Sequence, residues 1–85
     1  MGDWERAAAL FEQTLTARVR VLGPYHADTL NTRNGLADAY HEAGDRDAAA
    51  ALFEQTLVDC RRVLGRKHPL TRLVRANLTE LNRIS

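Results

Sequence analysis

Phe11–Leu15 reads FEQTL, and the same five letters return at Phe53–Leu57, forty-two residues later. When residues 1–43 are aligned with residues 43–85, nineteen of the forty-three pairs are identical. Repeats of this length usually mark small helical units that stack to bury one continuous core. The two copies therefore predict a repeat fold rather than an irregular single domain.

The composition fits one small folded domain. The chain has 85 residues, 45% of them hydrophobic and 27% charged, which is too apolar for a disordered chain. Cys60 is the only cysteine, so no internal disulfide can form, and no apolar run is long enough to span a bilayer. No secretory leader is recognisable, and a cytoplasmic location is expected. Met1 and Gly2 are interpreted as start or cloning residues, which would make the domain at residues 3–85 a piece of a longer protein.

Spacing and helix-end signals predict four helices and no strand. Asp3 and Asp45 each follow a glycine and precede an alanine-rich run, which is typical of an N-cap. Gly23 and Gly65 follow the two long helices and can adopt the left-handed conformation that ends a helix, while Pro69 suits a first helical turn. The expected helices are Asp3–Leu22, His26–Ala43, Asp45–Leu64 and Pro69–Ile84. Their apolar stripes predict a core of Phe11, Leu15, Leu36, Tyr40, Phe53 and Leu57.

The pattern Leu36-x3-Tyr40, Gly44-Asp45, Ala49-x3-Phe53 resembles the tetratricopeptide repeat, a helix-turn-helix unit. The forty-two-residue spacing, with Leu-Gly-x-x-His-x-x-Thr between the units, is similar to the longer kinesin-light-chain type. This resemblance implies an all-α fold, namely an α-solenoid fragment of antiparallel helix pairs. In the family's nomenclature the helix order is B-A-B-A, with one complete unit at Thr29–Leu64 flanked by two half units.

No pattern typical of an enzyme is found. Serine occurs only at Ser85, and the five glycines form neither a phosphate-binding loop nor a dinucleotide fingerprint. His26 and His68 are repeat equivalents, expected about 10 Å apart, too far to share one metal ion, and are interpreted as helix-capping or loop-packing residues. Cys60 is on the same helix face as Phe53, which favours a buried thiol, although Arg61 and Arg62 would activate an exposed one. We therefore predict no catalytic residue, no cofactor and no metal site.

The family resemblance places a ligand groove on the two shorter helices. It assigns groove positions to Asn31, Asn34, Asp38, His41 and Glu42, and to the equivalents Leu73, Ala76, Glu80, Arg83 and Ile84. Two asparagines one helical turn apart suit the backbone of an extended peptide, because each side chain is both donor and acceptor. His41 lies with Asp38 and Glu42 and is interpreted as a solvated groove residue or a ligand contact, with a metal or acid–base role as the remaining alternative.

Charge is distributed unevenly along the chain. Residues 1–59 carry a net charge of −5 and residues 60–85 a net charge of +6. This basic end indicates a solvated face, a contact with an acidic protein or a contact with nucleic acid, and no aromatic residue lies among the cations to stack on bases. The basic patch comprises Arg61, Arg62, Arg66, Lys67, Arg72 and Arg75.

The two half units leave helices without their usual neighbours. This arrangement predicts head-to-tail or domain-swapped association, with a monomer whose last helix folds back as the alternative. The expected contact residues are Trp4, Phe11, Leu73 and Leu81. The resemblance implies a protein–protein interaction or scaffold module, such as the arm of a larger bacterial signalling or transcriptional regulator. The alternative is a helical module that binds nucleic acid or an acidic partner through its basic end.

Overall fold

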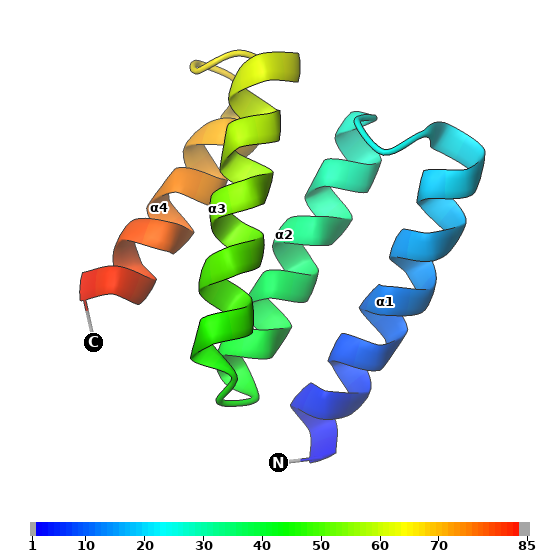
Figure 1. The fold of residues 1–85 in the computed structure, drawn as a ribbon, viewed down its shortest axis with the longest axis vertical. Coiled ribbons are helices and arrows are strands. Elements are labelled where there is room, and N and C mark those ends of the chain that lie inside the picture. Colours follow the sequence, from blue (N-terminus) through cyan, green and yellow to red (C-terminus); the bar gives the residue numbers. More distant parts are fainter. Residues whose placement is uncertain (1, 84–85) are drawn as a thin grey trace.

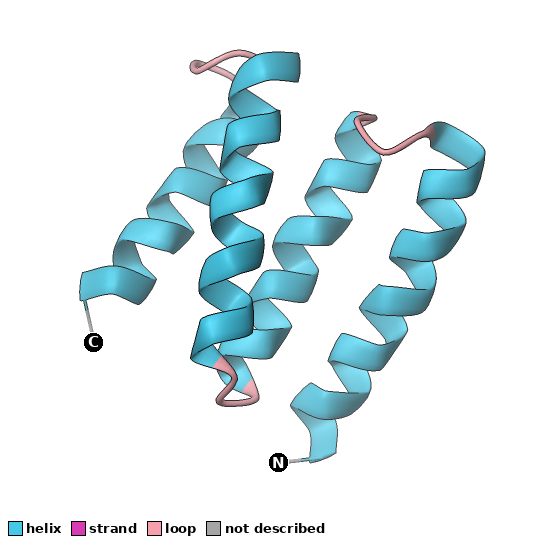
Figure 2. Cartoon of the chain, viewed as in Figure 1, coloured by secondary structure: helices cyan, strands magenta, loops and turns pink. Residues whose placement is uncertain are grey.

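The computed structural model describes residues 2–83, and this part of the chain is all-α (Figures 1 and 2). Its helices are α1 (Gly2–Leu22), α2 (Ala27–Glu42), α3 (Arg46–Val63) and α4 (Pro69–Arg83). Each helix agrees with its predicted counterpart to within one or two residues at the described ends. Ile84, the expected end of the last helix, lies outside the described residues.

The helices form two layers. Helix α2 packs against α1 and α3, α3 packs against α4, and α2 also contacts α4. Within the described residues no Cα atom of α1 comes within 8 Å of one in α3, so the short helices α2 and α4 are closer together than the long ones. The connections α1–α2 and α3–α4 lie at one end of the molecule and the α2–α3 turn at the other (Figure 1). This arrangement confirms the predicted α-solenoid fragment of antiparallel helix pairs, with α2 and α4 on its inner side.

Histidine caps begin both inner helices. The backbone N–H of Asp28 donates to Nδ1 of His26, and the N–H of Leu70 donates to Nδ1 of His68, each at 3.0 Å. These bonds satisfy amide groups that a helix start leaves without partners. The interpretation of the two histidines as capping residues is confirmed. Pro69 is the first residue of α4, as predicted.

The two predicted aspartate caps differ in the structure. Asp45 caps α3 by accepting a hydrogen bond from the N–H of Ala48 at 3.2 Å. It follows Gly44, whose φ of 91° turns the chain sharply after α2. Asp3 lies inside α1, so its prediction as an N-cap is wrong. The chain is already helical at Gly2 and makes no such turn before Asp3, whose carboxylate instead stands in the first turn, where the helix dipole favours it.

The core runs through all the helices. One cluster joins Leu30 and Ala37 of α2 to Phe53, Leu57 and Cys60 of α3, with Val74 and Leu81 of α4. A second cluster joins Ala8 of α1 to Leu36 and Ala39 of α2. The predicted core residues Leu36, Phe53 and Leu57 are buried, whereas Phe11, Leu15 and Tyr40 are half-buried. Phe11 and Leu15 remain partly exposed because α1 lies at the edge and is covered on its α2 side alone among the described residues.

Gly35 sets how closely α1 approaches α2. A Cβ atom at this position would lie 2.6 Å from Cε1 of Phe11. The phenyl ring therefore occupies the space that any other residue would need for its side chain. The close contact explains a glycine in the middle of a helix, where it normally costs stability.

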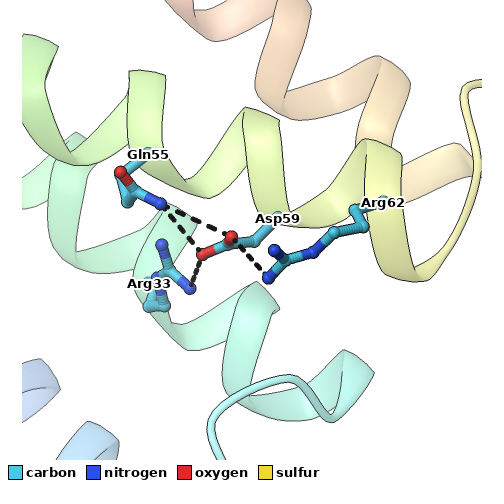
Figure 3. Close-up of polar contacts among 4 residues, drawn as sticks. All are labelled: Arg33, Gln55, Asp59 and Arg62. Carbon is cyan, nitrogen blue, oxygen red and sulfur yellow. Dashed lines mark hydrogen bonds and ion pairs between the residues drawn. The ribbon is translucent and has the colours of Figure 1, made fainter.

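A buried ion pair holds α2 against α3 (Figure 3). Nη1 of Arg33 donates to Oδ2 of Asp59 at 2.8 Å, and the two side chains are 12% and 6% exposed. Gln55 and Arg62 each contact Oδ1 of the same carboxylate at 3.4 Å. The guanidinium of Arg62 also lies over the ring of Tyr25, 5.3 Å from its centroid, which adds the loop before α2 to the cluster.

Asp59→Asn is expected to lower the free energy of unfolding by about 2–3 kcal/mol, because it leaves the nearly buried Arg33 charge without an anion. Urea denaturation followed by circular dichroism measures this loss. Glu80→Gln is the matched control: it breaks the exposed Glu80–Arg83 pair and should cost about 0.5 kcal/mol or less. Equal losses in the two variants would contradict the prediction.

Gly35→Ala is expected to destabilise the protein by about 1 kcal/mol or more, because the added methyl group collides with Phe11. In an open helical position the same change stabilises by up to about 1 kcal/mol, so the sign is informative. Urea denaturation of the variant in a Phe11→Leu background provides the control, since the shorter side chain makes room for the methyl group. A gain in stability in the wild-type background would refute the close-contact explanation.

Candidate functional site

The candidate site is the inner face, formed by the exposed sides of α2 and α4. The two helices are joined by a hydrogen bond from Nδ2 of Asn77 to Oδ1 of Asn34 at 3.1 Å. Beside this contact, a cleft of about 360 Å³ opens at the start of both helices, with Asn31 on one side and Leu73 on the other. Asn31 is exposed and Leu73 is 48% exposed, so both are available to a ligand.

Asn34 differs from its predicted role. It is 7% exposed, and its carbonyl oxygen is already used by Asn77. Its place is therefore in the contact between the inner helices, beneath the surface that a ligand would meet. The sequence did not indicate the Asn34–Asn77 bond, because the repeat does not duplicate it. The equivalent of Asn77 in the first copy is Gly35, which has no side chain to donate a hydrogen bond.

Asp38, His41 and Glu42 lie together at the far end of the inner face of α2. Their potential ligand atoms are all within 4.8 Å of one another, and the two acids are exposed. The described part of the chain offers these three side chains no hydrogen-bond partner. Two carboxylates and an imidazole can accept hydrogen bonds from a lysine, an arginine or an amino terminus. All three are on one helix, and the prediction that no metal is bound here stays a prediction.

The second half of the inner face carries different chemistry. On α4, Glu80 and Arg83 pair with each other at 3.0 Å, and both side chains are largely exposed. Ala76 is exposed and presents only a methyl group. Ile84, the last predicted groove residue, lies outside the described residues. The inner face therefore combines an acidic group on α2 with a self-neutralised pair on α4.

The six residues of the predicted basic patch do not form one surface in the structure. Arg62 is directed to Asp59 and Tyr25 and belongs to the cluster between α2 and α3. Arg61 is exposed on α3. The remaining four cations line one open cleft of about 370 Å³ at the α3–α4 loop and α4: Arg66, Lys67, Arg72 and Arg75.

The residues predicted for self-association do not form one exposed surface. Trp4 is 42% exposed on α1, and Phe11 is half-buried against Gly35. Leu81 is 1% exposed and packs in the main core, so it is not available as an exposed contact. Sequence reasoning missed Leu10 and Val21 of α1, which are 64% and 78% exposed. Leu10 lines a cleft between α1 and α2 that includes Asn31, and Val21 lines a second cleft that includes Asp28. The repeat equivalents of Leu10 and Val21, which are Leu52 and Val63, are less exposed.

Two titratable residues in or beside the core, Cys60 and Tyr40, have raised pKa values. Burial raises the pKa of the Cys60 thiol, and the nearby charge that lowers it is Arg33 rather than Arg61 or Arg62. The hydrogen bond that Tyr40 donates to Glu12 raises the pKa of Tyr40 to about 12 and joins α2 to α1. Among the described residues, no helix is both long and apolar enough to cross a membrane.

Comparison with known proteins gives one family. A family model for the tetratricopeptide repeat matches residues 1–57, which is more than half of the chain. Searches of curated proteins and of solved structures returned no match.

Cys60 is expected to be inert in the folded protein, because it is 0% exposed and its pKa is raised by burial. The thiol reagent DTNB should react with it on the order of 100-fold more slowly in buffer than in urea, since reaction requires opening of the core. A Gln13→Cys, Cys60→Ala variant, with its thiol at an exposed position of α1, is the control. Equal rates for the two folded proteins would contradict the buried assignment.

Proposed function

Because the chain belongs to the tetratricopeptide repeat family, whose members are protein–protein interaction and scaffold modules, we propose that its inner face binds an extended segment of a protein partner. The observation that carries this proposal is the free surface of α2. At one end α2 presents Asn31, which lies beside Leu73 of α4. At the other end it presents the group Asp38, His41 and Glu42.

The spacing of these residues defines the ligand. Asn31 and Asp38 are seven residues apart and therefore lie on the same helix face, about 10 Å from each other. A chain in the polyproline II conformation covers this distance in about three residues, which is one turn, so side chains three residues apart lie on the same side. A partner segment with an apolar residue, two residues of any kind and then a basic residue would place its apolar side chain on Leu73 and its cation on Asp38 and Glu42. Asn31 would hydrogen-bond the backbone between them.

The resemblance seen in the sequence also supports a larger context. We propose that the module is the arm of a bacterial signalling or transcriptional regulator, in which it recruits the partner.

A second candidate function is self-association at the α1 edge, favoured by exposed Trp4, Leu10 and Val21. Light scattering on the free protein tests the latter: the mass should rise above the 9.5 kDa monomer with concentration, and Leu10→Glu should reverse this rise.

The inner-face proposal predicts selectivity for a basic residue. A fluorescent peptide containing Leu-Ser-Ser-Arg is expected to bind more tightly than its Leu-Ser-Ser-Glu counterpart. The double variant Asp38→Asn, Glu42→Gln should weaken binding of the arginine peptide about 3- to 10-fold at low salt, as expected for two exposed ion pairs. Fluorescence anisotropy measures the dissociation constants.

Asp47→Asn is the matched control, because Asp47 is an exposed acid on the outer helix α3. It should leave the affinity unchanged. NMR shift changes on peptide addition should include Asn31, Asp38 and Leu73. Equal binding of both peptides, or shift changes confined to α1 and α3, would overturn the proposal.

A further inference from the structure

The outward face of α4 has no helix packed against it in the described chain. The internal repeat shows what this face corresponds to, because every residue of α4 has an equivalent in α2 forty-two positions earlier. Helix α2 meets α3 through Leu30, Arg33 and Ala37. Their equivalents in α4 are all exposed, and they define the outward face: Arg72, Arg75 and Thr79.

The outward face keeps one feature of the α2 surface and loses another. Arg75 is equivalent to Arg33, which bonds to Asp59 of α3 at 2.8 Å. By contrast, Arg72 and Thr79 replace Leu30 and Ala37, both of which are 0% exposed in the core. The apolar residues of α4 are already used, since Val74 and Leu81 pack in the core with α3. The outward face therefore occupies the repeat position of a helix-binding surface but is basic and polar.

The neighbouring loop strengthens this charge. Arg66 and Lys67 line the same cleft as Arg72 and Arg75. These four cations have no acidic residue among them in the lining of the cleft. None of the four makes an ion pair within the described residues. A partner that supplies carboxylates would be electrostatically complementary to this cleft.

We propose that the outward face of α4 binds an acidic helix of a protein partner. One carboxylate of that helix pairs with Arg75 in the way that Asp59 pairs with Arg33. A second acid one turn away faces Arg72, because residues three or four apart lie on the same side of a helix. Arg66 and Lys67 attract the acidic segment during association.

A second copy of this chain does not supply the required helix. The long helix that would follow α4 in the repeat order is equivalent to α3, and its counterpart within the chain is α1. Helix α1 has Ala17 where α3 has Asp59, and Arg18 where α3 has Cys60. Stacking α1 of another molecule on α4 would place Ala17 at the position of Asp59 and leave Arg75 without a carboxylate. The geometry favours a different, acidic partner.

Nucleic acid is less suited to this surface. The residues that line the cleft include no aromatic side chain on which a base could stack. The outward face instead lies at the repeat position through which α2 meets α3. It shares no residue with the inner-face group Asn31, Asp38, His41, Glu42 and Leu73, so its test is independent of the proposed peptide site.

The experiment compares two alanine-rich helical peptides of identical composition. In the first, two aspartates are four residues apart and lie on one face; in the second they are two residues apart and lie on different faces. Anisotropy at low salt is expected to show at least about 5-fold tighter binding of the first peptide. Arg75→Gln should weaken that binding about 10-fold, whereas Arg61→Gln, the matched exposed arginine on α3, should change it less than 2-fold.

Other outcomes overturn the proposal. Equal affinity for the two peptides would show that the acidic peptides bind by nonspecific charge attraction rather than as a helix with its acids on one face. The face would be assigned to nucleic acid if a single-stranded oligonucleotide bound more tightly than the aspartate peptide. In that case its affinity should fall steeply with salt, and this salt dependence should be lost in Arg75→Gln. Oligomers in sedimentation that Arg75→Gln abolishes would assign it to a second copy. Binding of the Leu-Ser-Ser-Arg peptide should be unaffected by Arg75→Gln, which shows that the variant is folded and separates the two sites.

Discussion

The burial of α2 on two sides is the constraint on which the rest of the structure depends. Leu36 and Ala39 pack toward α1, whereas Leu30 and Ala37 pack toward α3. A helix enclosed in this way has little surface left, and what remains is the strip that carries Asn31 and Asp38. The ion pair of Arg33 with Asp59 fixes α3 on one side, and the contact of Phe11 with Gly35 fixes α1 on the other. The inner face is therefore held by contacts that a ligand does not touch.

The fold was predictable because it is encoded locally, whereas the site was only partly predictable. Helix ends depend on neighbouring residues, so Gly23, Gly65, His26 and Pro69 could be interpreted correctly from the sequence. The Arg33–Asp59 pair spans twenty-six residues and has no equivalent in α1, so neither copy indicated it. Asn34 was assigned to the groove by the family resemblance, and Leu81 to a free end because the last half unit lacks its following helix; neither argument tells which neighbour covers the side chain. The structure shows that α4 covers Asn34 and that α3 covers Leu81.

The two copies of the repeat share one framework and differ in several buried and exposed residues. Thr29 and its equivalent Thr71 are both buried, and buried Leu36 has the identical, half-buried equivalent Leu78. Differences gather where the copies have different surroundings, as in Leu30 against Arg72. A repeat fold permits this because each unit contacts only its neighbours, so a surface can change chemistry without disturbing the next core. The chain therefore presents two unlike surfaces, an inner acidic one and an outward basic one, on nearly identical frameworks.

The position of α1 has a consequence for local unfolding. Within the described residues α1 packs against α2 alone, and Ala8 is its only buried residue, whereas α3 is held from two sides. The free energy needed to detach α1 is therefore smaller than that needed to open the α2–α3–α4 core. Amide hydrogens of α1 should exchange with solvent through this partial opening, while those of α3 wait for global unfolding. A neighbouring helix placed on the α1 edge would slow exchange along the whole of α1, because it removes the opening itself rather than covering individual amides.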